Sequence, residues 1–258
     1  MDRDQPLDEA VLRAGLTGMW RQLDVVERTG STNADLLARA ASGSDIAGRV
    51  LIAEHQTAGR GRQGRTWTAT PRTQLSMSVG VSVVDVPVAS WGWLSLATGI
   101  AVIDAVAGLG VRAGLKWPND VLAGPQDSPR KLAGILAEVA RPAVVVGLGL
   151  NVTEAPDGVD GATSLLDLGV AAPDRQSLVC TLLDELSSRI AQWRRGDSQL
   201  AADYRARSLT LGSRVRALLP GDREVIGTAT AIDEQGRLCL ESAGRAVVVS
   251  AGDVIHLR

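Results

Sequence analysis

The chain has 258 residues, which as a rough guide allows one large domain or a main domain with a small appendage. Hydrophobic residues make up 45% and charged residues 22% of it, values that are ordinary for a globular protein and exclude a disordered or fibrous chain. The formal net charge is only -2, so no overall positive field exists to hold nucleic acid or an anionic membrane. Any site for anions must therefore be local.

Cysteine usage and the N-terminal segment both predict a cytoplasmic protein. Cys180 and Cys239 are too few for a disulfide framework and lack a C-x-x-C spacing. The N-terminal segment is polar and acidic, whereas a signal peptide needs a basic start and then an apolar run. The segment 91–109 resembles a membrane span, but Asp104 and several glycines interrupt it. We therefore interpret this segment as a buried core helix.

The first 211 residues predict an α+β fold. The motif Thr32-Asn33-Ala34-Asp35 has the form of a capping box, which predicts a helix that begins there and ends before Gly43. Strict alternation of apolar with small residues from Leu75 to Val83 predicts a strand with one buried face. Apolar periodicity predicts a strand at 50–54, a helix at 91–109, strands at 115–122, 131–140 and 144–150, and a helix at 174–193. Antiparallel neighbours with the helices grouped apart predict a mixed or antiparallel sheet with helices on one face.

From Gly212 onward the sequence predicts short strands separated by turns rich in glycine and aspartate. The predicted strands are 214–219, 225–232, 237–241, 246–250 and 254–257. This pattern predicts a small SH3-like β-barrel at 212–258, behind a main domain at 1–211.

One loop concentrates glycine and arginine: Gly59-Arg60-Gly61-Arg62-Gln63-Gly64-Arg65. It matches the dinucleotide motif G-x-G-x-x-G and nearly matches the P-loop motif, but both motifs need a helix to follow, and here the next predicted element is a strand. The glycines allow close approach of the backbone to an anion, and the arginines add three positive charges. We interpret the segment as an anion-binding loop that orders only around its ligand. The alternatives are a solvated arginine run and a nucleic-acid segment, which the lack of interleaved aromatic residues disfavours.

Of the 27 basic residues only two are lysines, Lys116 and Lys131, and the other 25 are arginines. Lys116 opens the segment Lys116-Trp117-Pro118-Asn119-Asp120, in which the proline keeps Trp117 extended. This segment could be only a tight strand exit. Alternatively, Asp120 could hold Mg²⁺ or an arginine, with Lys116 near a phosphate.

Lys131 lies in the predicted strand 131–140. Alternation places it on one apolar face with Ala133 and Ile135, and places Glu138 on the opposite face. Glu138 is therefore not expected to be the partner of this lysine. A lysine on an apolar face is expected to meet an anionic ligand instead.

The sequence contains no pattern typical of a metal site or of a catalytic nucleophile. His55 and His256 are isolated, and no His, Cys and carboxylate group has metal-ligand spacing. A G-x-S-x-G motif is also absent. An anion site without a protein nucleophile predicts chemistry between two bound substrates.

Several motifs, taken in order and spacing, resemble those of biotin protein ligases. They are Gly30-Ser31-Thr32-Asn33, Gln56-Thr57-Ala58 with the loop and Thr66-Trp67, Lys116-Trp117-Pro118-Asn119-Asp120, Lys131-Leu132-Ala133-Gly134-Ile135-Leu136, and Gly147-Leu148-Gly149-Leu150-Asn151. The resemblance covers most of the chain. It implies a class II synthetase-like ligase core and two half-reactions. Biotin and MgATP give biotinyl-5′-AMP and pyrophosphate, and a lysine of a carrier domain then takes the biotin.

The resemblance also assigns roles to residues at the matching positions. Biotin would be bound by Ser31, Thr32, Asn33, Gln56, Gly59, Arg60, Gly61, Arg62, Lys131 and Gly134. ATP would be bound by Arg65, Trp67, Lys116, Asn119 and Asn151, and Mg²⁺ by Asp120. The residues expected to act in catalysis are Lys131, Arg60 and Arg62. ATP with Mg²⁺ and biotin would enter as substrates, and no tightly bound prosthetic group is expected.

The implied partner is the biotin carboxyl carrier domain of an acetyl-CoA, acyl-CoA or pyruvate carboxylase, with no DNA and no membrane. We expect a monomer or weak homodimer. Only about 30 residues precede Ser31, fewer than the roughly 50 of a small domain, so we expect no N-terminal DNA-binding domain. The alternatives are a lipoate-type ligase, which is not expected to carry the glycine-arginine loop, and a regulator that binds ligand without turnover.

Overall fold

A seven-stranded sheet forms the centre of the molecule. The computed structural model describes residues 5–156, 159, 161–221 and 223–257, so the outer ends of the two predicted domains lie outside the described residues. The strand order is β1-β2-β5-β9-β8-β7-β6. The strands are β1 (Gln22–Val26), β2 (Arg49–Ala53), β5 (Gln74–Ser82), β6 (Ala113–Lys116), β7 (Asp120–Ala123), β8 (Arg130–Ala140) and β9 (Ala143–Asn151). Because β1 and β2 pair in parallel and the other neighbours pair antiparallel, the predicted mixed sheet is confirmed.

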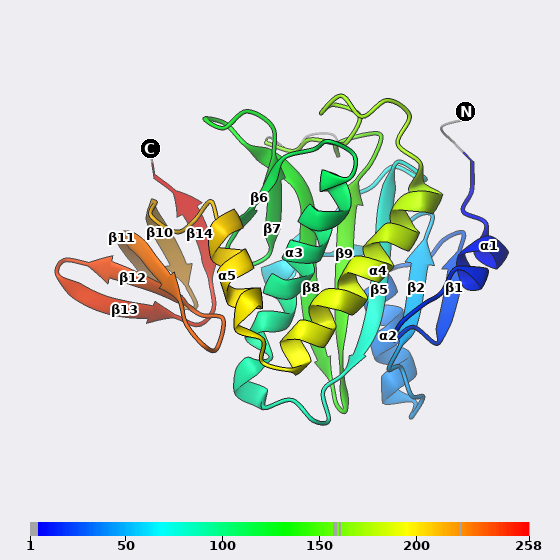
Figure 1. Cartoon of the computed structure of the whole chain (residues 1–258), viewed down its shortest axis with the longest axis horizontal. Helices are drawn as coiled ribbons and strands as arrows, with labels where there is room; N and C mark the ends of the chain where they lie inside the picture. The colour runs from blue at the N-terminus through cyan, green and yellow to red at the C-terminus, as the bar shows by residue number, and fades with distance from the viewer. Residues whose placement is uncertain (1–4, 157–158, 160, 222, 258) are drawn as a thin grey trace.

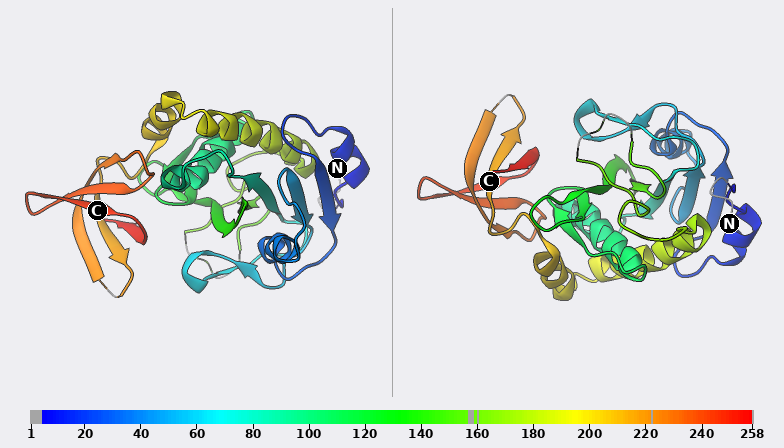
Figure 2. Two further views of the ribbon diagram at one scale, coloured as in Figure 1. Left: turned by 90° about the horizontal axis from the view of Figure 1, so that it is seen from below. Right: turned by 90° about the horizontal axis from the view of Figure 1, so that it is seen from above.

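Helices cover both faces of this sheet (Figures 1 and 2). The helices are α1 (Glu9–Ala14), α2 (Thr32–Ala41), α3 (Gly92–Ala107), α4 (Arg175–Arg194) and α5 (Ser198–Arg207), with short 3-10 turns η1 (Arg62–Gly64) and η2 (Val88–Ser90). Helices α3 and α4 lie on one face, and α2 lies on the other. The prediction that all helices lie on one face is therefore wrong for α2.

The reason for two covered faces lies in the central strands. Residues 74–81 of β5 and all of β9 are buried, because the serines and glycines of β5 are small enough to sit beneath a second layer. The prediction of one solvent-facing side for this strand is wrong for the same reason. Leu36 of α2 forms a separate apolar cluster with Leu51 and Val145, on the side away from α3. The start of α2 is close to the prediction, with Ser31 rather than Thr32 as the capping residue.

A buried ion pair fixes the N-terminal segment to the main body. Arg175, at the first turn of α4, places its Nη1 atom 2.6 Å from Oε2 of Glu54. Glu54 also accepts the backbone N–H of Leu7 at 2.6 Å, and Arg175 donates to the carbonyl of Gln5 at 2.9 Å. Local sequence patterns did not predict α1, β1 or α5. Their apolar patterns are short, and contacts with residues distant in the sequence stabilise them.

Glu54→Gln is expected to lower the free energy of unfolding by about 3 kcal/mol, because it leaves the buried charge of Arg175 without a partner. Glu27→Gln is the matched control, since Glu27 is exposed and its ion pair with Arg72 at 2.8 Å is expected to contribute less than about 1 kcal/mol. Urea unfolding of both variants measures the difference. Equal losses of unfolding free energy in the two variants would mean that burial does not increase the stabilising effect of the Glu54 ion pair.

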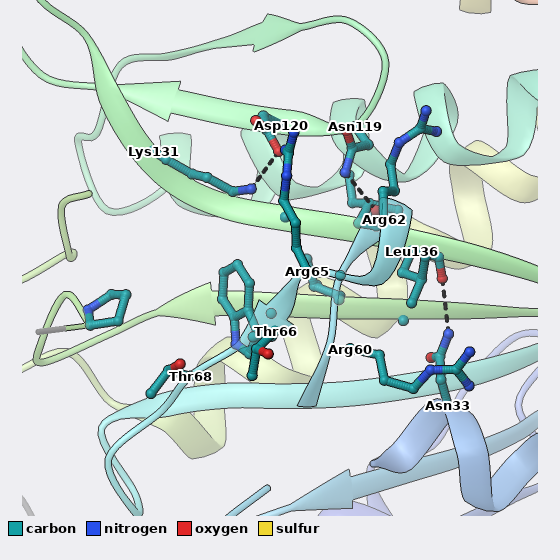
Figure 3. Close-up of a pocket in the computed structure, with 18 of the residues that line it drawn as sticks. Asn33, Arg60, Arg62, Arg65, Thr66, Thr68, Asn119, Asp120, Lys131 and Leu136 are labelled. Carbon is teal, nitrogen blue, oxygen red and sulfur yellow. Dashed lines mark hydrogen bonds and ion pairs between the residues drawn. The ribbon is translucent and has the colours of Figure 1, made fainter. Parts of the chain in front are cut away.

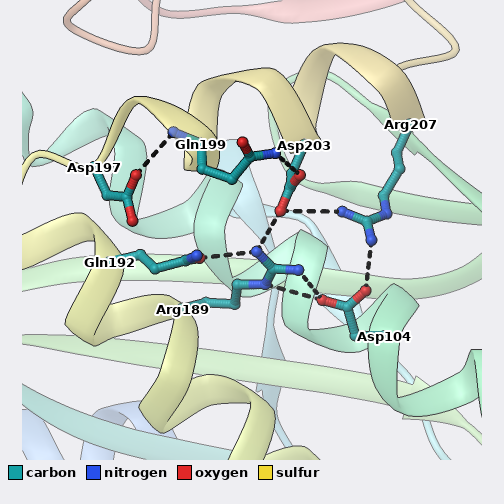
Figure 4. A network of polar contacts seen from close by, with 7 residues as sticks. All are labelled: Asp104, Arg189, Gln192, Asp197, Gln199, Asp203 and Arg207. Atoms are coloured by element: carbon teal, nitrogen blue, oxygen red, sulfur yellow. Dashed lines mark hydrogen bonds and ion pairs between the residues drawn. The ribbon is translucent and has the colours of Figure 1, made fainter.

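Helix α3 is the apolar segment that resembles a membrane span. The stretch Val88–Ala107 is long and apolar enough to cross a bilayer by length and composition, yet most of it is buried inside the molecule. Its one carboxylate, Asp104, accepts from Arg189 of α4 at 2.5 Å and from Arg207 of α5 at 2.8 Å (Figure 4). The charge that interrupts the segment thus joins three helices, which supports the interpretation of a core helix.

The C-terminal part is a five-stranded antiparallel sheet, here called the C-terminal sheet. Its strands are β10 (Arg214–Leu219), β11 (Arg223–Ile232), β12 (Leu238–Ser242), β13 (Arg245–Val249) and β14 (Asp253–His256). The order β13-β12-β11-β10-β14 pairs each neighbour antiparallel but does not pair β13 with β14. The closure of an SH3-like barrel therefore stays a prediction.

Two tryptophans join the C-terminal sheet to the main body. The indole of Trp117 donates to the carbonyl of Gly236 at 3.0 Å, and the indole of Trp93 donates to the carbonyl of Asp233 at 3.1 Å. Both acceptors lie in the turn before β12, and both indoles are buried. The C-terminal sheet is thus held next to the segment that follows β6.

Candidate active site

A cavity of about 390 Å³ lies at the face of the main sheet that also carries α2. Its wall includes the residues assigned by resemblance, namely Ser31, Thr32, Asn33, Gln56, Arg60, Gly61, Arg62, Arg65, Trp67, Lys116, Asn119, Asp120, Lys131, Gly134 and Asn151. Gly59 is the predicted residue that does not line it; a Cβ atom there would lie 2.4 Å from the carbonyl of Trp67. Side chains from three regions far apart in the sequence thus converge on one hollow (Figure 3).

The floor of the cavity is made by glycines of β8 and β9. Gly147 and Gly149 continue the face of β9 on which Val145 meets α2, because alternate residues of a strand share a face. A Cβ atom on Gly149 would lie 2.3 Å from the ring of Trp67, and one on Gly147 would lie 2.2 Å from Oδ1 of Asn33. The absence of side chains here is what makes room for Trp67 and Asn33 on the floor of the cavity.

The glycine-arginine loop folds over this floor. Strand β3 (Gly59–Arg60) pairs with β4 (Thr66–Trp67), and the N–H of Gly61 donates to the carbonyl of Arg65 at 2.7 Å. Trp67 lies against Gly149, and its indole N–H donates to Gln74 at 2.9 Å. Trp67 therefore packs its ring on the glycine floor and forms an apolar part of the cavity lining.

Carboxylates of the chain itself lie against the arginines of the loop. Arg60 is 3.0 Å from Glu138, while Arg62 and Arg65 both pair with Asp253. The expectation that this loop orders only around a ligand overlooked these carboxylates. They supply negative charge from parts of the chain distant in sequence.

Lys131 faces the cavity, but not with the neighbours predicted for it. The register of β7 against β8 shifts at this point, so that Val121 and Leu122 oppose Ala133 and Lys131. This β-bulge reverses the alternation, and Lys131 therefore shares a face with Gly134, the Cβ position of which is 3.2 Å from Nζ. The prediction that Lys131 shares an apolar face with Ala133 and Ile135 is therefore wrong.

The anion beside Lys131 is Asp120, 2.6 Å from Nζ (Figure 3). The ammonium group also lies 5.6 Å from the centroid of the Trp67 ring. Glu138 is not its partner, as predicted, but the predicted reason was wrong. The ion pair of Glu138 with Arg60 places it beside the loop, and what separates the two residues is distance along the strand.

A polar network closes the end of the cavity at α2. Thr32 donates its backbone N–H to Gln56 at 2.8 Å, and its hydroxyl lies 2.6 Å from that of Ser78. Ser78 donates to Oδ1 of Asn33 at 2.6 Å, and the amide of Asn33 donates to Glu138 at 2.9 Å. Buried hydroxyl and amide groups in such a hydrogen-bonded network can bind a small polar ligand with fixed orientation.

Two asparagines mark the other end. Asn119 donates to the carbonyl of Ile135 at 2.9 Å, which fixes the turn between β6 and β7. Asn151 donates to the carbonyl of Thr163 at 2.8 Å, but its buried Oδ1 accepts no hydrogen bond from any residue that the structure describes. A buried acceptor in this position is suited to a donor group on a ligand.

The charges around the cavity favour an anion. Burial lowers the pKa of the Arg62 guanidinium, whereas the charges of Asp253 and Asp120 oppose that shift. A guanidinium nevertheless stays protonated in proteins. Burial also lowers the pKa of His256, and the charge of Lys116 lowers it further, so this imidazole adds no positive charge at neutral pH.

Sequence reasoning missed four residues of the site: Ser78, Gln74, Glu138 as an arginine partner, and Asp253. The three small residues Ser76, Ser78 and Gly80 of β5 were visible as an alternating set, and their burial could have been inferred from the equal spacing of Gly147 and Gly149. Asp253 gave no signal, because its partners lie 188 and 191 positions away in the chain.

Gly149→Ala is expected to lower the efficiency of the reaction at this site by about tenfold or more, because the added methyl group would displace the ring of Trp67. Gly15→Ala is the control, since the nearest atom to its Cβ position is at 3.6 Å. Ligand affinity by calorimetry and initial rates measure the effect. Unchanged values for Gly149→Ala would show that contact with Trp67 is dispensable.

Known proteins similar in sequence indicate the family of this chain. A model of the biotin/lipoate A/B protein ligase family matches residues 25–151, and one of the biotin protein ligase C terminal domain matches residues 210–257. The chain is 67% identical to a biotin–[acetyl-CoA-carboxylase] ligase of Mycobacterium tuberculosis, over 100% of this chain and 99% of that protein. It is 34% identical to the bifunctional ligase/repressor BirA of Escherichia coli, over 83% of this chain and 67% of that protein.

A solved structure shows the same fold. Biotin protein ligase from Aquifex aeolicus in complex with biotin and ATP superposes with a TM-score of 0.78 at 24% identity, covering 93% of this chain and 100% of that one. The motifs around the cavity, the two family models and the full-length identity to a curated ligase all lead to one assignment. This chain belongs to the biotin protein ligase family.

Proposed function

We propose that the cavity binds biotin and ATP, joins them as biotinyl-5′-AMP, and presents this intermediate to a lysine of a carrier domain. The observation that carries this proposal is the set of five cationic side chains in the wall of the cavity: Lys116, Lys131 and the three loop arginines. Such a wall can neutralise a carboxylate and phosphates that would otherwise repel each other.

In the first half-reaction a carboxylate oxygen of biotin attacks the α-phosphorus of ATP. A carboxylate–phosphorus bond forms, the bond to the β-phosphate breaks, and pyrophosphate leaves with the electron pair. Lys131 lies between the loop and Asp120, where its ammonium group can contact both the carboxylate and the α-phosphate. We assign it to bridge them, so that the protein contributes alignment and charge neutralisation.

In the second half-reaction the amine of the carrier lysine attacks the carbonyl carbon of the mixed anhydride. An amide forms, AMP leaves, and the amine loses a proton. The chain assists by holding AMP as leaving group, with Arg65, Asn119 and Asn151 as the proposed contacts. Trp67 excludes water from the anhydride until the carrier arrives.

Magnesium fits this cavity as a companion of ATP rather than as a resident ion. No cluster of three or more metal-ligating side chains occurs in the part of the chain that the structure describes. Asp120 offers one carboxylate at the wall, and Mg²⁺ commonly binds through one or two carboxylates together with substrate phosphates. We propose that Asp120 would hold it, where it would neutralise phosphate charge.

The acceptor is proposed to be a biotin carboxyl carrier domain, since the relative from Mycobacterium tuberculosis has an acetyl-CoA carboxylase in its name. We keep as proposals a cytoplasmic location, action without DNA or membrane, a monomeric or weakly dimeric state and a closed SH3-like C-terminal barrel. None of these features enters the mechanism above.

A labelling experiment tests the proposed function. The chain is incubated with labelled biotin, MgATP and a carrier domain, and the expected result is label on the carrier that depends on ATP. A carrier with its acceptor lysine changed to arginine should stay unlabelled. Pyrophosphate release without carrier distinguishes an enzyme from a regulator, and labelled lipoate in place of biotin tests the alternative ligase. Transfer of lipoate but not biotin would refute the proposal.

A further inference from the structure

Asp253 brings a carboxylate from the C-terminal sheet to the wall of the cavity. It pairs with Arg65, and Nε of Arg62 lies 3.9 Å from its Oδ1 atom. Arg62 also donates to the carbonyl of Gly252 at 2.9 Å. Two arginines of the glycine-arginine loop thus contact a single turn of the C-terminal sheet.

This turn is held in place on its other side. A Cβ atom on Gly252 would lie 2.2 Å from the carbonyl of Leu218, so the turn is pressed against β10. Asp253 is itself buried and pairs in register with Leu218 in the ladder between β10 and β14. The indole of Trp117 fixes the same sheet to the main body through Gly236. Asp253 is therefore a rigid anchor relative to the cavity.

The charges at this anchor do not cancel. Arg60 has Glu138 and Lys131 has Asp120, each as one cation with one carboxylate. Arg62 and Arg65 share the single charge of Asp253, which leaves one positive charge in surplus at the cavity wall. A carboxylate placed in this way holds two guanidinium groups in position without neutralising both.

We propose that Asp253 is a positioning residue that holds Arg62 and Arg65 at the cavity wall for the phosphates of ATP. The inference rests on the proposed function. Asp253 does not touch the reacting atoms. It acts through the two arginines, which would otherwise repel each other on a glycine-rich loop.

Asp253→Asn in the full-length chain tests this role. Pyrophosphate release is followed with saturating biotin and with hydroxylamine, which consumes the adenylate and allows turnover without a carrier. The KM for MgATP is expected to rise by about tenfold or more, with kcat changed by less than about threefold. Asp253→Glu keeps the charge and is expected to restore most of the affinity. Glu224→Gln, which removes the exposed partner of Arg216 at 4.0 Å within the same sheet, should leave KM unchanged.

A variant cycle separates positioning from a general structural role. In a chain that already carries Arg62→Gln and Arg65→Gln, Asp253→Asn should change KM by less than about twofold, because nothing remains to be positioned. An additive effect would overturn the proposal, as would an unchanged or lower KM for Asp253→Asn alone. Equal loss of melting temperature and affinity in the Asn and Glu variants would also overturn it. If the wild-type chain releases no pyrophosphate, the proposed function fails instead.

Discussion

Replacing Lys131 with arginine is expected to slow adenylate formation by about 10²- to 10³-fold, the cost of removing a well-placed charged donor from a reacting oxygen. The charge is kept, but the shape is not, since a wide planar fork replaces a compact ammonium group. Nζ lies 2.6 Å from Asp120 and 3.2 Å from the Cβ position of Gly134. Arginine would therefore present its charge in a different place relative to Asp120 and to the reacting oxygens.

Hydroxylamine-coupled pyrophosphate release and thermal unfolding check this expectation together. Arg130→Lys is a suitable control, because Arg130 is the preceding residue of β8 and is exposed. We expect the Lys131 variant to unfold within a few degrees of the wild type. A nearly normal rate at an unchanged melting temperature would remove Lys131 from the catalytic role.

Arg62→Gly is expected to release the adenylate from the site and to raise the labelling of bystander proteins by about tenfold or more, since a free acyl phosphate acylates any amine. Arg62 links the loop to Gly252 at 2.9 Å and to Asp253. Glycine removes both links. Of the two loop arginines that pair with Asp253, only Arg65 then remains.

Biotin, ATP and serum albumin as bystander, followed by mass spectrometry, measure the escape. Gln63→Gly is the matched control, because Gln63 has a φ of 53° that favours glycine and the change leaves every loop arginine in place. The enzyme should label itself little, since it has only two lysines and Lys131 is paired with Asp120. Bystander labelling at the wild-type rate would contradict the role given to Arg62. Heavy modification of Lys131 would contradict its placement as a charge-paired residue.

Local patterns in the sequence predicted the elements that are long and periodic. The helices that became α3 and α4, and the strands of the main and C-terminal sheets from β5 onward, lie within a few residues of their predicted bounds, apart from the hairpin β6–β7, which was predicted as one span. That hairpin turns at Trp117 and Pro118, a feature that apolar periodicity does not reveal. Short elements such as β1 and α5 were missed because neighbours distant in sequence stabilise them.

The structure brings the predicted residues, except Gly59, together around one cavity, but their pairings were not predicted. Lys131 lines this cavity, and a single bulged residue of β8 reversed the alternation used to orient it. Asp253 could not be found, since the proximity of β14 to the loop depends on how the C-terminal sheet docks through Trp117. Alternation describes one strand, whereas ion pairs depend on the assembly of all of them.

Even-numbered and odd-numbered residues of strand β9 serve two different needs, stability and ligand binding. Its even-numbered residues from Val144 to Leu150 belong to the apolar core beneath α3 and α4, while Gly147, Gly149 and Asn151 face the ligand cavity. Improvements in binding usually reduce stability, because the same positions serve both needs. Here a change at an odd position beyond Val145 alters what the enzyme accepts, and a compensating change at Val144, Val146 or Leu150, which do not line the cavity as Leu148 does, can restore stability without touching the substrate. Laboratory evolution toward larger biotin analogues could therefore vary the two sets independently.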